Sequence, residues 1–153
     1  MLTSQPTNML MELPDLLRKY PLNDAAGCSD GQKYFNKYIA PRYLKNESRA
    51  QRDFCVKTGL GKYVYQELRG VRPLYKIKGE DTLLRVAFGL RLTSEEAFML
   101  FLYSGRIVIF NDPVWSAIYL IILELDIIRS DMNKVDLVAD LDNLIAKNHL
   151  HLR

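Results

Sequence analysis

Residues 48 to 70 read SRAQRDFCVKTGLGKYVYQELRG, a pattern that predicts two short helices joined by a tight turn. Ser48 and Gln51 have the capping-box spacing, in which each side chain bonds the backbone amide of the other residue, so the first helix is expected over residues 49–58. Gly59 suits the C-terminal cap, because glycine adopts the left-handed conformation without a steric penalty. The residues expected to face the core from this helix are Ala50, Phe54 and Cys55.

The second short helix is expected from Lys62 to Arg69, between Gly61 at its N-cap and Gly70 at its end. Its apolar side is formed by Val64, Tyr65 and Leu68. Its polar side carries Lys62, Gln66 and Arg69, whose spacing of i, i+4 and i+7 forms one helical stripe. Two short helices around a glycine-containing turn, with a polar stripe on the second, have the arrangement of a helix-turn-helix.

Helical segments broken by glycine, proline and capping residues fill the rest of the chain, with little of the alternation typical of strands. They are expected at residues 9–20 with a break at Pro14, 33–44 with a last turn distorted by Pro41, 81–92, 93–104 behind the capping box Thr93–Glu96, 113–125 behind the N-cap Asp112, and 135–150. The segment from Ile107 to Phe110 could be extended. The chain is predicted to be all-α, with Leu84 and Trp115 in the core.

The charge is distributed unevenly along the sequence. Residues 1–32 carry a net −2, residues 33–78 a net +9 from twelve basic and three acidic side chains, and residues 79–153 a net −4, which together give +3. Such a basic block favours a polyanion-binding face, because each neutralised phosphate releases condensed counterions. The alternative is a set of solvated helix faces whose charges cluster only in sequence.

Length and composition exclude several classes of protein. A chain of 153 residues that is 48% hydrophobic and 25% charged matches one globular domain, or a small domain with an extension, rather than a disordered or fibrous chain. Cys28 and Cys55 lack metal-site spacing and indicate a reducing compartment. The first residues lack the basic lead of a signal peptide, and no uncharged run reaches the ~18 residues of a membrane span. We therefore expect a soluble, cytoplasmic protein without membrane contact.

The segment from Gln51 to Glu96 has further features beside its apolar spacing. Gln51 lies near the start of the first short helix, Phe54 and Cys55 pair a large with a small residue, and Gly59-Leu60 pairs glycine with an aliphatic residue in the turn. In these positions, and at Tyr65, Leu68 and residues 82–97, the chain resembles the helix-turn-helix domain of phage-repressor-like (Xre-type) transcription regulators. A subgroup with a C-terminal helical extension is more similar still, at residues 65–69 and 101–105.

The resemblance implies a lambda-repressor-like helix-turn-helix bundle with additional C-terminal helices. Residues 1–32 would then be an N-terminal arm and residues 33–105 the helix-turn-helix domain. Residues 106–153 would form a helical extension that packs on the domain or forms a dimer contact. The apolar helix at residues 114–125 fits a buried bundle core as well as it fits a dimer interface.

The resemblance also implies a set of DNA contacts. Lys62, Tyr63 and Gln66 would face the major groove, where lysine suits guanine, glutamine suits adenine and tyrosine suits a phosphate or a thymine methyl group. Phosphates would be held by Gln51, Arg52, Lys57, Arg69 and Arg72, with Lys76 and Lys78 on the following connector. The chain departs from the family at Gly61, which offers no side-chain acceptor at the N-cap, and at the bulky Tyr63.

The expected function is therefore a DNA-binding transcription regulator that binds duplex DNA, commonly as a homodimer. The alternative is a protein-interaction module derived from the same scaffold, such as an anti-repressor, an inhibitor or a subunit of a phage or defence complex, which would contact its partner through the N-terminal arm or the C-terminal helices. No enzyme activity, cofactor or metal is expected, because His149 and His151 lie at the chain end and no nucleotide, nucleophile or metal motif occurs.

Overall fold

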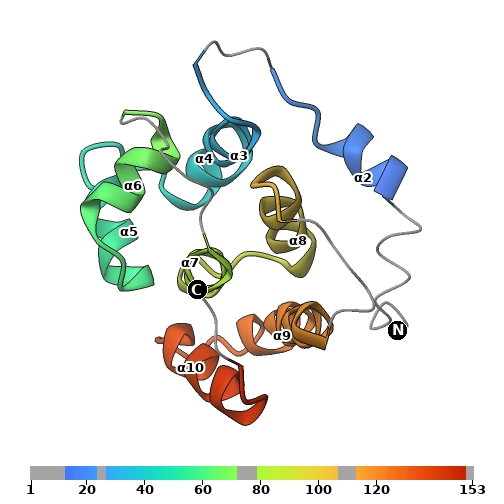
Figure 1. The fold of residues 1–153 in the computed structure, drawn as a ribbon. Helices are drawn as coiled ribbons and strands as arrows, with labels where there is room; N and C mark the ends of the chain where they lie inside the picture. The colour runs from blue at the N-terminus through green and yellow to red at the C-terminus, as the bar shows by residue number, and fades with distance from the viewer. Residues whose placement is uncertain (1–12, 24–26, 72–78, 107–112, 151–153) are drawn as a thin grey trace.

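The computed structural model describes residues 13–23, 27–71, 79–106 and 113–150, and every regular element in these ranges is a helix (Figure 1). The elements are α2 (Leu13–Lys19), α3 (Asp30–Tyr34), the π-helix η1 (Phe35–Ile39), α4 (Ala40–Tyr43), α5 (Ala50–Thr58), α6 (Lys62–Arg69), α7 (Glu80–Gly89), α8 (Ser94–Tyr103), α9 (Pro113–Arg129) and α10 (Leu137–Lys147). The all-α prediction is confirmed. The features predicted at residues 9–12, at Ile107–Phe110 and at Asp112 lie outside the described residues.

The elements α3, η1 and α4 follow one another directly and form a single helical rod. The rod begins behind Ser29, whose hydroxyl accepts the amide of Gln32 at 3.3 Å while the Gln32 side chain accepts the amide of Ser29 at 2.8 Å. This capping box starts the helix earlier than the predicted residue 33. The irregularity expected at Pro41 appears in the turn before it, where the amide of Ala40 bonds the carbonyl of Phe35.

The middle of the molecule is formed by α7 and α8 (Figure 1). Helix α7 contacts α5, α8 and α10, and α8 contacts α3 and α9. The buried residues of α7 are Leu83, Leu84, Val86, Ala87 and Phe88, and those of α8 include residues 96–101. The predicted capping box of α8 is confirmed, because the Thr93 hydroxyl accepts the amide of Glu96 at 3.1 Å and the Glu96 carboxylate accepts the amide of Thr93 at 3.0 Å.

Helix α9 is apolar on two sides but buried on one. Its buried residues are Trp115, Ile118, Tyr119, Ile121, Ile122 and Leu125, while Val114, Leu120 and Ile127 are exposed. The helix therefore belongs to the bundle core and also presents an apolar outer side. No helix within the described ranges, α9 included, is both long and apolar enough to cross a membrane.

Two further helices start later than predicted. Helix α5 begins at Ala50 behind Arg49 without a side-chain cap, because the Ser48 hydroxyl instead donates to the side-chain oxygen of Asn46 at 2.7 Å. Helix α10 begins at Leu137, because the Asp136 carboxylate accepts the first-turn amides of residues 138 and 139. Val135, the first residue of the predicted helix, precedes that cap and is 92% exposed.

Candidate nucleic-acid interface

The turn between α5 and α6 is fixed by its own residues. Helix α5 ends at Gly59, whose φ of 74° lies in the left-handed region that glycine tolerates. The buried Thr58 hydroxyl donates to the carbonyl of Phe54 at 2.7 Å and accepts the amide of Leu60 at 3.2 Å. Gly61 is extended, and α6 begins directly after it. Two short helices are thus joined by a tight turn, as predicted.

Helix α6 buries the side that its apolar spacing predicts. Tyr65 and Leu68 are buried, and the Tyr65 ring lies 5.3 Å from that of Phe54, which in turn lies 6.1 Å from Phe35 of η1. The predicted core residues Phe54, Tyr65, Leu68, Leu84 and Trp115 are all confirmed, whereas Cys55 is only half-buried. Helices α5 and α6 lie side by side at one edge of the molecule (Figure 1).

The outward side of this pair carries most of the predicted contact residues, which we call the α5–α6 surface. Its exposed members are Gln51, Arg52, Lys57, Lys62 and Tyr63, and Gln66 is half-buried. The Gln66 amide donates to the Gln51 side-chain oxygen at 3.2 Å, and the Lys62 ammonium lies 5.4 Å from the centre of the Tyr63 ring. The polar edges of the two helices therefore form one continuous surface.

No family model, curated protein or solved structure matches the chain.

Arg69 occupies a different position from the rest of the predicted set. Its guanidinium donates to the side-chain oxygen of Asn36 at 2.6 Å and to the Tyr65 hydroxyl at 2.8 Å, and it lies 3.5 Å from the Glu47 carboxylate. Its side chain is only 22% exposed. Arg69 therefore ties α6 to η1 and to the loop before α5, with its donors directed at its own chain. Arg72, Lys76 and Lys78 lie outside the described residues.

The basic block of the sequence divides between two surfaces. Lys45 and Arg49 are exposed in the loop that leads into α5, and neither was predicted as a contact. Lys37 and Arg42 lie instead beside α2 and α8, where Arg42 donates to the Glu96 carboxylate at 2.9 Å.

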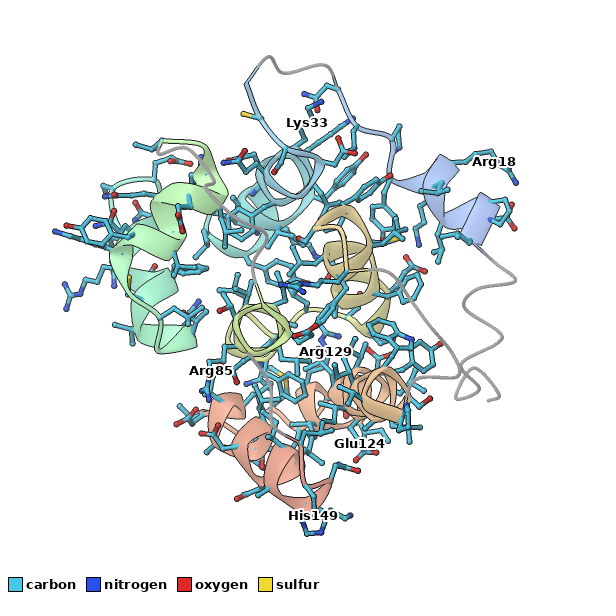
Figure 2. The ribbon with its side chains drawn as sticks, viewed as in Figure 1. Arg18, Lys33, Arg85, Glu124, Arg129 and His149 are labelled. Carbon is cyan, nitrogen blue, oxygen red and sulfur yellow. The ribbon has the colours of Figure 1, made fainter. Side chains whose placement is uncertain are left out.

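The two histidines of the chain, His149 and His151, come after α10 in the sequence. His149 lies beyond the end of α10, away from α5 and α6 (Figure 2). In the part of the chain that the structure describes, no group of three His, Cys, Asp or Glu side chains is placed to hold a metal ion. His151 lies outside that part.

Proposed function

We propose that the chain is a sequence-specific, duplex-DNA-binding transcription regulator of the helix-turn-helix type, with α6 in the major groove. The observation that carries this proposal is the hydrogen bond between Gln66 and Gln51, because it joins the outward edges of both helices into one exposed polar surface. The major groove admits an α-helix, and the preceding helix then crosses the phosphate backbone. The resemblance to Xre-type regulators supports the same docking.

The surface suggests a role for each residue. Lys62, Tyr63 and Gln66 are assigned to base edges, since they lie on the first two turns of α6. Phosphate contacts are assigned to Gln51, Arg52, Lys57 and Arg72, the last on the sequence resemblance alone. Arg69 is assigned a positioning role, because its donors already bind Asn36 and Tyr65.

The proposal includes a lambda-repressor-like bundle extended by α9 and α10. Proteins of the helix-turn-helix type commonly bind as dimers to half-sites about one DNA turn apart. In this chain a second copy would use the outer side of α9, where Leu120 and Ile127 are exposed.

Fluorescence anisotropy with labelled duplexes over a salt series tests the proposal. Affinity should fall steeply with added salt, and it should differ between duplexes of random sequence and duplexes from upstream of the native gene. Lys62→Gln should weaken binding by about 1–3 kcal/mol. The matched variant Lys147→Gln removes an exposed lysine from α10 and should bind as the wild type does. Salt-independent binding, or equal effects of the two variants, would refute the proposal.

A second candidate function is a protein-interaction module. It is favoured by apolar side chains on the helix pair and just after it. Val56 of α5 is 75% exposed, Tyr63 of α6 is 56% exposed, and Val71, past the end of α6, is 74% exposed. DNA phosphates give the two valines no partner, whereas a protein surface would bury them. Recovery of one stoichiometric protein partner on tagged chain, together with no DNA retention at low salt, would select this function.

A further inference from the structure

An open hollow lies where α2, the α3–η1–α4 rod and α8 meet, and we call it the α2–α8 hollow. It has a volume of about 440 Å³ and is lined by Lys19 and Tyr20 near the end of α2, Lys37 and Tyr38 of η1, and Pro41 and Arg42 of α4. Pockets for small molecules measure roughly 300–1,000 Å³. The hollow is therefore large enough for a small organic ligand.

Glu96 of α8 lines this hollow, and Glu95 binds two of its lining residues, so both carboxylates already have hydrogen-bond partners. Glu96 is 3% exposed and accepts from Arg42 at 2.9 Å, from the Tyr43 hydroxyl and from the amide of Thr93. Glu95 accepts from the Lys19 ammonium at 2.7 Å and from the Tyr20 hydroxyl at 2.6 Å. Burial raises the pKa of the Glu95 carboxyl, but these two hydrogen bonds outweigh it and leave the pKa below its ordinary 4.5. Glu95 is therefore ionised at neutral pH.

Three cations line the hollow, and two of them are paired with carboxylates. Lys19 faces Glu95 and Arg42 faces Glu96, so Lys37 is the cation without a carboxylate among the described residues. The Lys37 ammonium donates to the carbonyl of Pro21 at 2.9 Å, and an ammonium has three donors. Arg42 bonds Glu96 through one terminal nitrogen, and its side chain is 59% exposed. Both groups thus retain N–H donors for an anion.

The remaining walls are flat and apolar. The rings of Tyr20 and Tyr38 meet edge to face at 5.1 Å, and the Tyr38 hydroxyl donates to the carbonyl of Pro21 at 2.5 Å. Both tyrosine hydroxyls are bonded to the protein, so Tyr20 and Tyr38 can offer a ligand only the carbon atoms of their rings. Pro41 adds a third ring to the lining. A planar ring gains from stacking or edge contacts with such walls.

We propose that the α2–α8 hollow binds a small aromatic carboxylate. The carboxylate lies between Lys37 and Arg42, and the ring lies against Tyr38 and Pro41. A single negative charge matches the one unbalanced cation, whereas a phosphate monoester would bring more charge than the hollow neutralises. The inference goes beyond DNA binding and requires no nucleic acid.

The test is an NMR titration of the ¹⁵N-labelled full chain with benzoate, its uncharged analogue benzamide, and phenyl phosphate. Benzoate should give saturable shifts centred on the amides of Tyr20, residues 37–40 and Arg42, with a Kd of about 1 mM. Benzamide should bind at least about tenfold more weakly, because it lacks the charge that Lys37 and Arg42 recognise. Phenyl phosphate should also bind more weakly than benzoate.

Lys37→Gln should weaken benzoate binding by about tenfold, while Lys45→Gln, which removes an exposed lysine outside the hollow, should leave it unchanged. Lys37→Gln should still fold, because Tyr38 also holds the carbonyl of Pro21, and its urea unfolding curve verifies this. Equal binding of benzamide and benzoate, tighter binding of phenyl phosphate, or equal effects of the two variants would overturn the proposal. Because no DNA is present, such a failure is distinct from failure of DNA binding.

Discussion

Gly89, the last residue of α7, lies against the backbone at the end of α5. A Cβ atom at this position would stand 2.5 Å from the carbonyl oxygen of Lys57 and 2.7 Å from the Cα of Thr58. Non-bonded atoms of a folded protein do not approach so closely, so any side chain at Gly89 would push α7 away from the end of α5. The glycine therefore sets the distance between α7 and the turn that leads into α6.

Gly89→Ala is predicted to lower the free energy of unfolding by about 1–3 kcal/mol, because backbone atoms cannot move aside as a flexible side chain can. Urea unfolding measures the change. Gly61→Ser is the matched control, since nothing lies within 4 Å of a Cβ there and φ is −78°. The serine hydroxyl can accept a first-turn amide of α6, and the substitution should raise the free energy of unfolding by roughly a few tenths of a kcal/mol. Equal stability of Gly89→Ala and wild type would contradict the close approach.

Arg69→Gln is predicted to lower the free energy of unfolding by about 1–3 kcal/mol, because the charge-assisted bonds to Asn36 and Tyr65 are lost. Arg52→Gln removes an exposed arginine of the same helix pair and should change stability by less than about 0.5 kcal/mol. Chemical denaturation of both variants separates a structural arginine from a surface one. Equal stabilities would show that Arg69 does not tie α6 to η1.

The sequence predicts burial better than it predicts the use of polar residues. Phe54, Tyr65 and Leu68 could be placed in the core because helical spacing of apolar residues follows directly from burial. The role of Arg69 could not be predicted, because its partner Asn36 comes from another element, 33 positions away. Ser48 failed as a cap for a local reason, since Asn46 competes for its hydroxyl.

Whole elements were predicted where apolar periodicity and caps agreed. Helices α5, α6 and α8 follow their predicted spans to within a few residues, because glycine or a Thr–Glu capping box marks their ends. The start of the α3–η1–α4 rod was missed because Asp30 and Gly31 are typical of a turn. The Ser29–Gln32 capping box overrides them. The π-helix has no signal in spacing, since it adds a residue to one turn without changing which residues are apolar.

The docking of α2 is predicted to weaken in acid. The pKa of Glu95 is below its ordinary 4.5 in the folded chain, because the carboxylate binds Lys19 and Tyr20. These bonds therefore contribute fully to the free energy of unfolding above pH 4.5, the unfolded value. The contribution is lost as the pH falls through the lowered pKa of the folded chain. Urea unfolding at several pH values should therefore show that the difference in free energy of unfolding between wild type and Glu95→Gln shrinks in acid. Lys19→Gln should show part of the same change. A pH-independent difference between wild type and Glu95→Gln would contradict this linkage.

At the level of the whole molecule, packing and a set of hydrogen bonds around Arg91 join the C-terminal helices to the centre of the bundle. Helix α9 packs on α8, and α10 packs on α7. Arg91, in the turn after α7, donates to the carbonyls of Lys134 at 2.6 Å, Arg129 at 3.0 Å and Asp131 at 3.1 Å. Arg129 donates back to the carbonyl of Arg91 at 2.9 Å. These contacts predict that residues 33–105 and 106–153 unfold together.

Trp115 reports on this coupling, because the single tryptophan of the chain lies on α9, is 5% exposed and has its ring 5.9 Å from that of Phe101 of α8. Its fluorescence and the far-UV circular dichroism of all helices should show the same urea midpoint. Arg91→Gly removes the guanidinium, and glycine tolerates the φ of 59° at this residue. The free energy of unfolding should fall by about 1–3 kcal/mol, and the two urea midpoints should fall together. A tryptophan transition at lower urea than the circular dichroism transition would instead show an extension that unfolds by itself, and residues 106–153 would then be a separate unit docked on the domain.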